Sequence, residues 1–318
     1  MVPQPLLLLA IEPKTKADQD KLAEGLQRLS AEDPTLCVQA NQQNRSVIIG
    51  AMGELHLEII LHRLRREFGV EAMVGKPEVA YKETLTCPAD GEMKYAKHAG
   101  GRSHYAHVKI RLLPGEPGSG YVFVNEIVGG AIRDEYIKPI DDGVREALAN
   151  GVLAGYPIDD VRVELYDGSY HDDDSSAMAF TIAGAAAFQD AARRAHPVLL
   201  EPIMRLEVVV PKEYLADVMA NLLSRQGRIQ SQEDRGGAHV IQVLVPLAEM
   251  LGYASDLRSR SQGRATYSMR LDRYEQRDHG ADNDDDVGSA VTAPHNSGPN
   301  INRSGVALPE PDDDALEI

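Results

Sequence analysis

The sequence predicts an α+β protein in which two ferredoxin-like domains, each a split βαβ unit, flank a third α+β segment. Residues 1–76 and residues 201–276 both show apolar periodicities in the order strand, helix, strand, strand, helix, strand. The length of 318 residues is enough for two or three domains, each with its own core.

The first domain is predicted from short apolar runs and two helical stripes. Strands are expected at residues 6–11, 36–40, 47–49 and 70–74. The first helix is marked by Leu22, Leu26 and Leu29. The second helix carries an apolar face, and Gly69 is expected to end it. That face consists of Leu57, Ile60, Leu61, Leu64 and Phe68.

The domain at 201–276 repeats this order with different residues. The expected elements are a strand at 204–210, a helix at 215–223, strands around Ile229 and at 240–245, a helix from Leu247 towards Arg258, and a closing strand at 265–271. The repeat is one of fold order, since the two copies share no matching residues.

Between these domains, the polar segment 167–176 (DGSYHDDDSS) separates a strand pattern from an Ala-rich helix pattern. Apolar residues alternate through residues 161–165, as in a half-buried strand, and helical spacing begins at Met178. We expect a loop here, with Asp174 or Ser175 accepting from the first free N–H groups of the helix.

Three interpretations of this loop compete. In the first, the loop is a plain strand–turn–helix connection whose polarity reflects exposure and capping. In the second, it is a metal site, although three adjacent Asp residues cannot all point inward and further ligands would have to come from elsewhere. In the third, it is a recognition tip for nucleic acid or protein, where Tyr170 and His171 stack and form hydrogen bonds.

A second loop, residues 97–105 (KHAGGRSHY), precedes an expected strand at 106–112. Its adjacent glycines permit an anion-binding nest beside Arg102, although such a pair before a strand is more often a plain turn. His98, His104 and His107 suggest a metal, but His104 and His107 are an odd number of positions apart and would face opposite sides of a strand.

Composition narrows the functional classes. Half of the net charge of −16 lies in residues 277–318, which hold 2 Lys/Arg and 10 Asp/Glu and no apolar period, so disorder is expected there. No apolar run approaches the length of a membrane span, and the N-terminus has no signal-peptide pattern. Cys37 and Cys87 are the only cysteines, which excludes a disulfide framework and favours a reducing compartment.

Two nucleotide-related modules are also disfavoured. An RNA-recognition motif needs aromatic residues on its central strands, and the candidate third strands, 47–52 and 238–245, have none. The pattern GxxxxGK[ST] is absent from the sequence, so a Walker-type phosphate loop is not expected.

Nine short motifs, in order along the chain, resemble bacterial translation elongation factor G. They are EPKT at 12–15, GELHLE at 53–58, GKP at 75–77, GGR at 100–102, DGSYH at 167–171, EPIM at 201–204, VPLAEM at 245–250, YASDLRS at 253–259 and QGR at 262–264. The resemblance runs from about residue 6 to residue 274 and therefore leaves out only the acidic tail.

The resemblance implies domain III at 1–76, an elongated domain IV arm at 77–200, domain V at 201–276, and a disordered acidic tail at 277–318. The GTP-binding domain and the domain II barrel of the family would precede residue 6 and are not in this sequence. We therefore expect no cofactor in this chain and no GTP hydrolysis by it alone, although the family is a GTPase. A GTPase domain in trans, or GTP-independent action, would be required.

The resemblance also implies a cytoplasmic, ribosome-binding factor without a membrane partner that promotes movement of tRNA and mRNA. Its partners would be ribosomal RNA, the tRNA–mRNA duplex at the decoding side and the stalk base. No residue is expected to be catalytic or to bind metal. The expected contact residues at the tip of the arm are Gly100, Gly101, Arg102, Ser103, His104, Tyr105, Ser169, Tyr170, His171, Asp172 and Asp173.

Three of these positions depart from the pattern of the family. Ser103 and His104 stand where the family usually has Gly and Gln, and Asp173 stands where an apolar residue is common. An added negative charge facing phosphates is unfavourable, by about 1 kcal/mol or less when exposed. The alternative to a working factor is a truncated, non-catalytic remnant or a stand-alone interaction protein.

Overall fold

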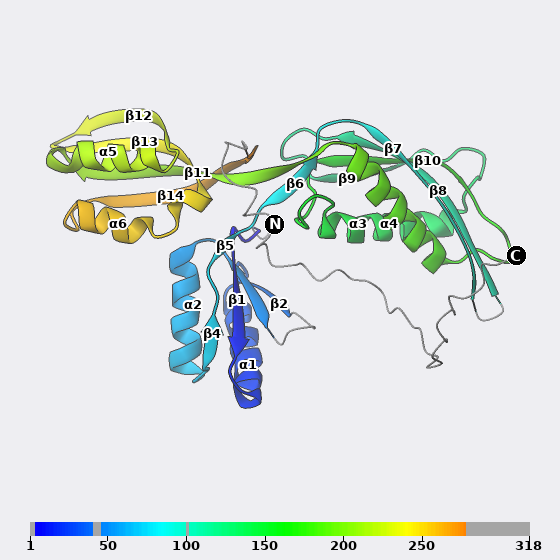
Figure 1. Ribbon diagram of the computed structural model, residues 1–318, viewed down its shortest axis with the longest axis horizontal. Coiled ribbons are helices and arrows are strands. Elements are labelled where there is room, and N and C mark those ends of the chain that lie inside the picture. The colour runs from blue at the N-terminus through cyan, green and yellow to red at the C-terminus, as the bar shows by residue number, and fades with distance from the viewer. Residues whose placement is uncertain (1–3, 41–45, 100–101, 278–318) are drawn as a thin grey trace, which may run out of the picture.

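The chain folds into three bodies joined by extended segments, as the computed structural model in Figure 1 shows. The structure describes residues 4–40, 46–99 and 102–277, and at positions 40, 98, 99, 102 and 103 it describes the backbone only. Gly100, Gly101 and the tail from residue 278 onward, with the disorder predicted for it, lie outside the described residues.

The first body is the predicted ferredoxin-like unit. Its main sheet has the order β2-β3-β1-β4 with antiparallel neighbours, which is the arrangement of a split βαβ fold. Thr15 caps the first helix by accepting from the N–H of Asp18, and Gly69 adopts a left-handed φ of 61° after the second. The elements are β1 (Leu7–Pro13), α1 (Lys16–Glu32), β2 (Cys37–Ala40), β3 (Val47–Ala51), α2 (Glu54–Glu67) and β4 (Ala72–Val74).

The third body repeats this topology in the order β12-β13-β11-β14. The helix expected from Leu247 towards Arg258 is wrong as a single element, because Gly252 takes a left-handed φ of 74° and separates a 3-10 turn from a short helix. The elements are β11 (Pro197–Pro211), η1 (Lys212–Tyr214), α5 (Leu215–Ser224), β12 (Arg228–Arg235), β13 (Ala238–Pro246), η2 (Leu247–Met250), α6 (Tyr253–Arg260) and β14 (Thr266–Gln276).

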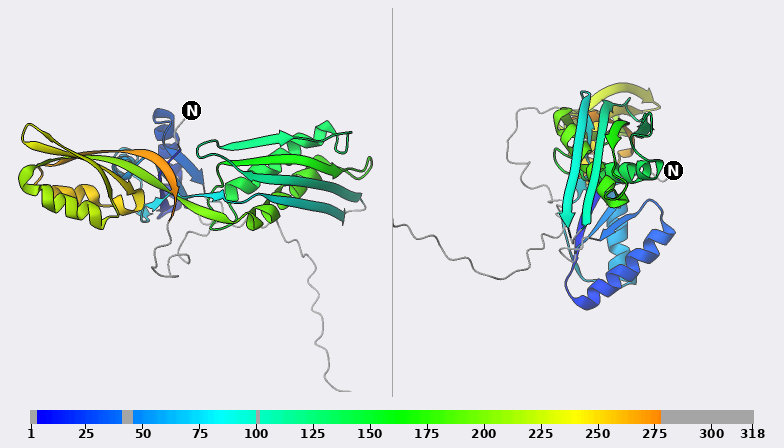
Figure 2. Two further views of the ribbon diagram at one scale, coloured as in Figure 1. Left: turned by 90° about the horizontal axis from the view of Figure 1, so that it is seen from above. Right: turned by 90° about the vertical axis from the view of Figure 1, so that its right-hand side faces the viewer.

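The middle body is a four-stranded sheet in the order β7-β8-β10-β9, with two helices packed on one face (Figure 2). The predicted strand and helix on either side of the 167–176 segment are confirmed, although the strand extends through Ser169. The elements are β7 (Ala89–Ala99), β8 (Arg102–Pro114), β9 (Tyr121–Asn125), α3 (Asp134–Asn150), β10 (Val161–Ser169) and α4 (Ala177–Arg194).

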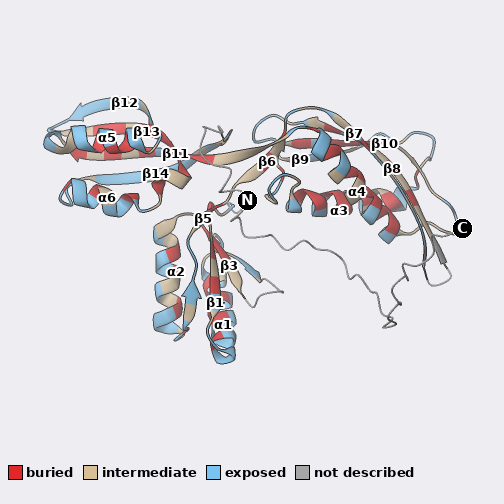
Figure 3. Ribbon diagram, viewed as in Figure 1, coloured by how far each residue is buried: buried red, intermediate tan, exposed pale blue. Residues whose placement is uncertain are grey.

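The two helices of the middle body approach very closely because glycines face the contact. A Cβ on Gly143 of α3 would overlap the carbonyl of Thr181 on α4, and a Cβ on Gly184 would lie 2.8 Å from the carbonyl oxygen of Ile140. Both helices carry many buried residues, as the red segments of α3 and α4 in Figure 3 show. This packing covers one face of the long sheet and leaves its other face open.

Short strands join the bodies. β5 (Glu78–Val79) pairs with β1 of the first body, and β6 (Lys82–Leu85) pairs with the start of β11. The side chain of Glu54 accepts from the N–H of Gly252 at 3.1 Å, and one continuous apolar core extends through the first and third bodies. Within the described residues, no helix combines the length and the apolar character of a membrane span.

Candidate nucleic-acid interface at the tip of the middle domain

The two segments singled out in the sequence meet at one end of the middle sheet. The strand β8, which pairs with β7, meets the connection from β10 to α4 at Tyr105, which forms a parallel bridge with Ser175. The expected loop at 97–105 is largely wrong, because β7 runs to Ala99 and β8 starts at Arg102. The polar residues of the 97–105 segment therefore lie mainly in two paired strands that extend to the tip.

The backbone of Tyr105 is fixed by the β10–α4 connection. Its N–H donates to the carbonyl of Asp174 at 2.8 Å, and its carbonyl accepts from the Ser175 hydroxyl at 2.9 Å. The same hydroxyl accepts from the N–H of His171 at 3.0 Å. The prediction that Asp174 or Ser175 caps α4 is wrong, because Ser176 accepts from the N–H of Ala179 and leaves Ser175 to join the two segments.

The side chain of Tyr105 is held from three directions. Its ring meets the ring of His171 edge-on, with centroids 4.1 Å apart and planes at 74°. Its hydroxyl lies 2.8 Å from the hydroxyl of Ser169, and the ammonium of Lys94 lies 5.7 Å from its ring centroid. Three of the expected tip residues, Tyr105, Ser169 and His171, are therefore in mutual contact through Tyr105.

A β-bulge after Leu165 places Ser169 on the open face of the sheet. Val163 and Leu165 point towards the helices, and simple alternation would send positions 167 and 169 the same way. The register shifts between Leu165 and Asp167, so Asp167 and Ser169 instead pair with Lys109 and His107 on the open face.

Tyr170 and Asp172 turn to the other side of the tip, towards α3. The Tyr170 ring lies 6.4 Å from that of Tyr136, which in turn stacks on Phe180 of α4 at 4.5 Å. Arg133 lies 4.8 Å from the centroid of the Tyr170 ring and forms an ion pair with Asp172. Burial raises the pKa of Tyr136 above its ordinary value.

The remaining expected residues are placed as follows. Asp173 is exposed, and His104 is half-buried one position before Tyr105 on the helix-facing side of β8. Arg102 and Ser103 open β8, where the structure describes their backbone only, and Gly100 and Gly101 lie outside the described residues. The expectation that His104 and His107 face opposite sides is confirmed by the burial of Ala106 and Val108 between and beyond them.

Sequence reasoning missed Arg133, Lys94 and Glu92, which all contact tip residues or their supports. Arg133 precedes α3, a helix whose interior contains Pro139, a residue that argues against a helix, although Tyr136, Ile140 and Val144 recur at helical spacing. The alternation of Met93 and Tyr95 towards the core was the available signal for β7. Among the described residues, no group of three His, Cys, Asp or Glu side chains is arranged to hold a metal.

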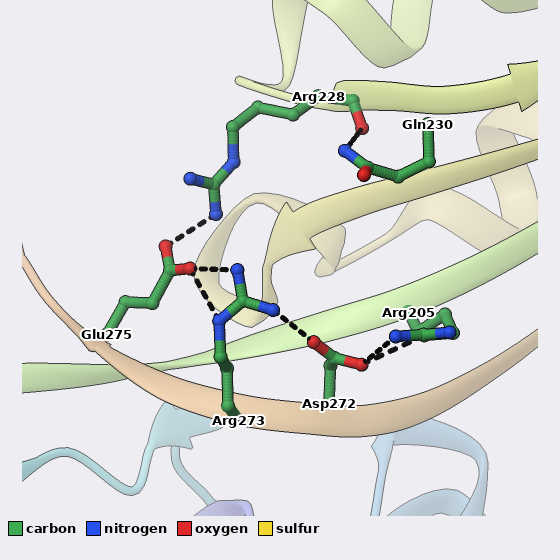
Figure 4. Close-up of polar contacts among 6 residues, drawn as sticks. All are labelled: Arg205, Arg228, Gln230, Asp272, Arg273 and Glu275. Atoms are coloured by element: carbon green, nitrogen blue, oxygen red, sulfur yellow. Dashed lines mark hydrogen bonds and ion pairs between the residues drawn. The ribbon is translucent and has the colours of Figure 1, made fainter. Parts of the chain in front are cut away.

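A second polar surface, on the third sheet, contains charged groups that pair with one another (Figure 4). Arg205 donates twice to one carboxylate oxygen of Asp272, at 2.9 and 2.5 Å. Glu275 accepts from Arg228 at 2.5 Å and from Arg273 at 2.7 Å. Because these guanidinium groups are neutralised within the domain, the surface is a weaker candidate for phosphate binding than the tip.

The fold and the tip define a protein with two ferredoxin-like domains and a long arm that presents aromatic and polar residues at its end. Three family models match successive parts of the chain: "Elongation Factor G, domain III" at residues 2–76, "Elongation factor G, domain IV" at 77–196 and "Elongation factor G C-terminus" at 198–283. The chain belongs to the elongation factor G family and is similar to part of a translation elongation factor.

A solved structure supports this assignment. A protein from Thermus thermophilus, known from its crystal structure, is 39% identical to this chain and superposes with a TM-score of 0.70. The match covers 88% of this chain and 42% of the Thermus protein, so the chain spans less than half the length of that relative.

Proposed function

We propose that these domains form the ribosome-contacting part of a translocation factor, and that the tip of the middle domain occupies the space beside the tRNA–mRNA duplex at the decoding side. In this role the tip hinders slippage or return of the duplex while the ribosomal subunits rotate. Ribosomal RNA and the stalk base are the proposed partners of the other two domains. GTP hydrolysis is assigned to a GTPase domain that acts together with them.

The observation that carries the proposal is the joining of two distant segments into one tip through Tyr105. The backbone and the side chain of Tyr105 are both held by hydrogen bonds, and its ring contacts His171. His171 is therefore presented on a supported surface and not on a free loop. A steric block needs such support, since a mobile loop would yield to the moving duplex.

The chemistry of the tip suits binding and not catalysis. His171 is exposed, so its ring is available to stack on a base or to hydrogen-bond with RNA. Lys97 is exposed near the end of the hairpin and provides a positive charge for phosphate groups. The charge of Asp172 is balanced by Arg133, which leaves Asp173 as the exposed acidic group that opposes phosphate.

Co-sedimentation with ribosomes over a series of salt concentrations tests the proposal. Binding through phosphate contacts weakens steeply as salt rises, because counterions are released when the complex forms. We expect the chain to pellet with ribosomes at low salt and to dissociate progressively as salt increases. Failure to co-sediment at low salt would remove the proposed function.

A matched pair of variants locates the contact. Lys97→Ala removes a charge near the tip, whereas Arg193→Ala removes one near the end of α4, where the neighbouring Arg194 contacts Asp90 at the opposite end of β7. The measured quantity is the slope of the logarithm of the ribosome-binding constant against the logarithm of the salt concentration. We expect Lys97→Ala to reduce the magnitude of this slope by about one and Arg193→Ala to leave it unchanged. Equal effects of both variants would argue against the tip as the contact.

A further inference from the structure

A chain of polar side chains runs along the open face of the middle sheet and ends at the tip. The carboxylate of Glu92 on β7 lies 2.8 Å from Nε2 of His107 on β8. Nδ1 of His107 lies 3.2 Å from the hydroxyl of Ser169 on β10, and that hydroxyl lies 2.8 Å from the hydroxyl of Tyr105. The chain thus links an exposed carboxylate to the tyrosine that supports His171.

Donor and acceptor chemistry sets the direction of these hydrogen bonds. An ionised carboxylate only accepts, so Nε2 of His107 must carry the proton that Glu92 accepts. In neutral imidazole the other nitrogen is then an acceptor, and the Ser169 hydroxyl donates to it. Because the Ser169 proton is committed to His107, the Tyr105 hydroxyl donates to Ser169.

Protonation of His107 reverses the direction of the two hydrogen bonds that link His107 to Ser169 and Ser169 to Tyr105. Both ring nitrogens of imidazolium are donors, so Nδ1 then donates to the hydroxyl oxygen of Ser169. The Ser169 proton turns towards Tyr105, whose hydroxyl changes from donor to acceptor. The Tyr105 proton must then point away from Ser169.

Several charged groups surround His107 on this face. Glu92 contacts it from β7, and Lys94 on the same strand is its register partner. Lys109 follows two residues later on β8 and binds Asp167 of β10 at 3.0 Å. Two carboxylates and two ammonium groups therefore face the imidazole, and His107 itself is largely shielded, with 17% of its side chain exposed.

We propose that His107 is a positioning residue for the tip and that its protonation is transmitted through Ser169 and Tyr105 to the ring of His171. Glu92 fixes the tautomer, Ser169 relays the change in hydrogen-bond direction, and the edge-on ring contact carries it to His171. The importance of this coupling for tRNA movement rests on the proposed function, whereas the coupling itself is a property of the free protein.

Nitrogen-15 and proton NMR of the histidine side chains in the full chain tests the coupling directly. At a pH where His107 is neutral, its proton should lie on Nε2. The signals of the His171 ring should show two inflections on titration, one of its own and one at the pH where His107 titrates. A neutral His107 with its proton on Nδ1, or a single His171 inflection in the wild-type protein, would overturn the proposal.

Variants separate a relay from a merely structural contact. Ser169→Ala should abolish the second His171 inflection, and Ser169→Thr, which keeps a hydroxyl, should restore it. Ser268→Ala, which removes a serine from strand β14 of another domain, should leave both inflections in place. Persistence of the second inflection in a folded Ser169→Ala protein contradicts the relay.

A second variant tests the same link without altering Ser169. Glu92→Gln keeps an oxygen that accepts from Nε2 but removes the negative charge beside the ring. We expect the titration of His107 and the second inflection of His171 to move together, by the same number of pH units. If the His107 titration moves while the second His171 inflection stays, the proposal fails.

Discussion

The rings of Tyr105 and His171 lie edge-on with their centroids 4.1 Å apart, and the Ser175 hydroxyl bonds to the backbone of both residues. The hydroxyl accepts from the His171 N–H and donates to the Tyr105 carbonyl. Two segments distant in the sequence are thus joined both through a ring contact and through one serine. This double connection distinguishes a supported tip from two separate loops.

Replacement of His171 by Ala should leave the fold nearly intact, because the ring is exposed and the edge-on contact contributes about 0.5–1.5 kcal/mol. Ser175→Ala should cost about 1–3 kcal/mol, because it removes an acceptor for one N–H group and a donor to the Tyr105 carbonyl. Urea unfolding of the two variants compares their losses in the free energy of unfolding. A larger loss of this free energy for His171→Ala than for Ser175→Ala would show that the imidazole is structural.

Glu83→Gln should strongly destabilise the middle domain. This fully buried carboxylate accepts four backbone N–H groups, and an amide would turn an NH2 group towards two of them. The donors belong to Val152, Leu153, Ala154 and Tyr156, at 2.7–3.1 Å. We expect a loss of about 3 kcal/mol in the free energy of unfolding.

Glu116→Gln is the matched control, because Glu116 is exposed and should change stability by no more than about 0.5 kcal/mol. Thermal and urea unfolding of both proteins provide the comparison. Similar midpoints for the two variants would mean that the buried carboxylate does not stabilise the 152–156 segment.

Gly143→Ala should destabilise the packing of α3 against α4. The added methyl would overlap the carbonyl of Thr181, and overpacking of this kind costs about 1–3 kcal/mol. Gly53→Ala is a control for the steric overlap, since no atom beyond its chain neighbours lies within 4 Å of the position that its methyl would take. Unfolding midpoints measure the difference, and equal values would contradict the close helix contact.

Stability should depend on acid pH through Asp167. The hydrogen bond from Lys109 is the main cause that holds the pKa of Asp167 below its ordinary value. The stabilisation is therefore complete above the unfolded pKa of about 3.9 and is lost as pH falls through the lower folded value. Asp167→Asn should lower the urea midpoint at pH 6 but change it less at pH 3.

The exposed Asp173 provides the control for this experiment. Asp173→Asn should leave the midpoint nearly unchanged at both pH values. An Asp167→Asn effect that is equally large at pH 3 and pH 6 would assign the loss to packing and not to the ion pair.

Removal of residues 278–318 should leave the melting temperature nearly unchanged, as expected from the acidic, low-complexity composition of that segment. The structure shifts the boundary by one residue from the predicted start at 277. The Arg277 N–H donates to the carbonyl of Leu199 at 2.9 Å, and its guanidinium lies 5.5 Å from the centroid of the Tyr81 ring. Differential scanning calorimetry of truncations before and after Arg277 should detect a small loss only for the shorter protein.

The sequence determined the fold of the two flanking domains because their elements are local and strongly periodic. The alternation at 204–210 lies within the strand Pro197–Pro211, and the spacing at 215–223 lies within the helix Leu215–Ser224. Motifs in order also established the family, and the segment 167–171 contained Ser169, Tyr170 and His171 of the tip. The helix α3 was missed, because its internal Pro139 argues against a helix even though its buried residues recur at helical spacing.

Tertiary structure alone decided how the tip residues are arranged. Alternation predicts that Ser169 points towards the helices, and the bulge after Leu165 reverses this by one residue. Strand register then brings Glu92, His107, Ser169 and Tyr105 together from β7, β8 and β10. A local pattern specifies the period of a strand, but pairing with distant strands fixes its register, and these side-chain contacts follow from that register.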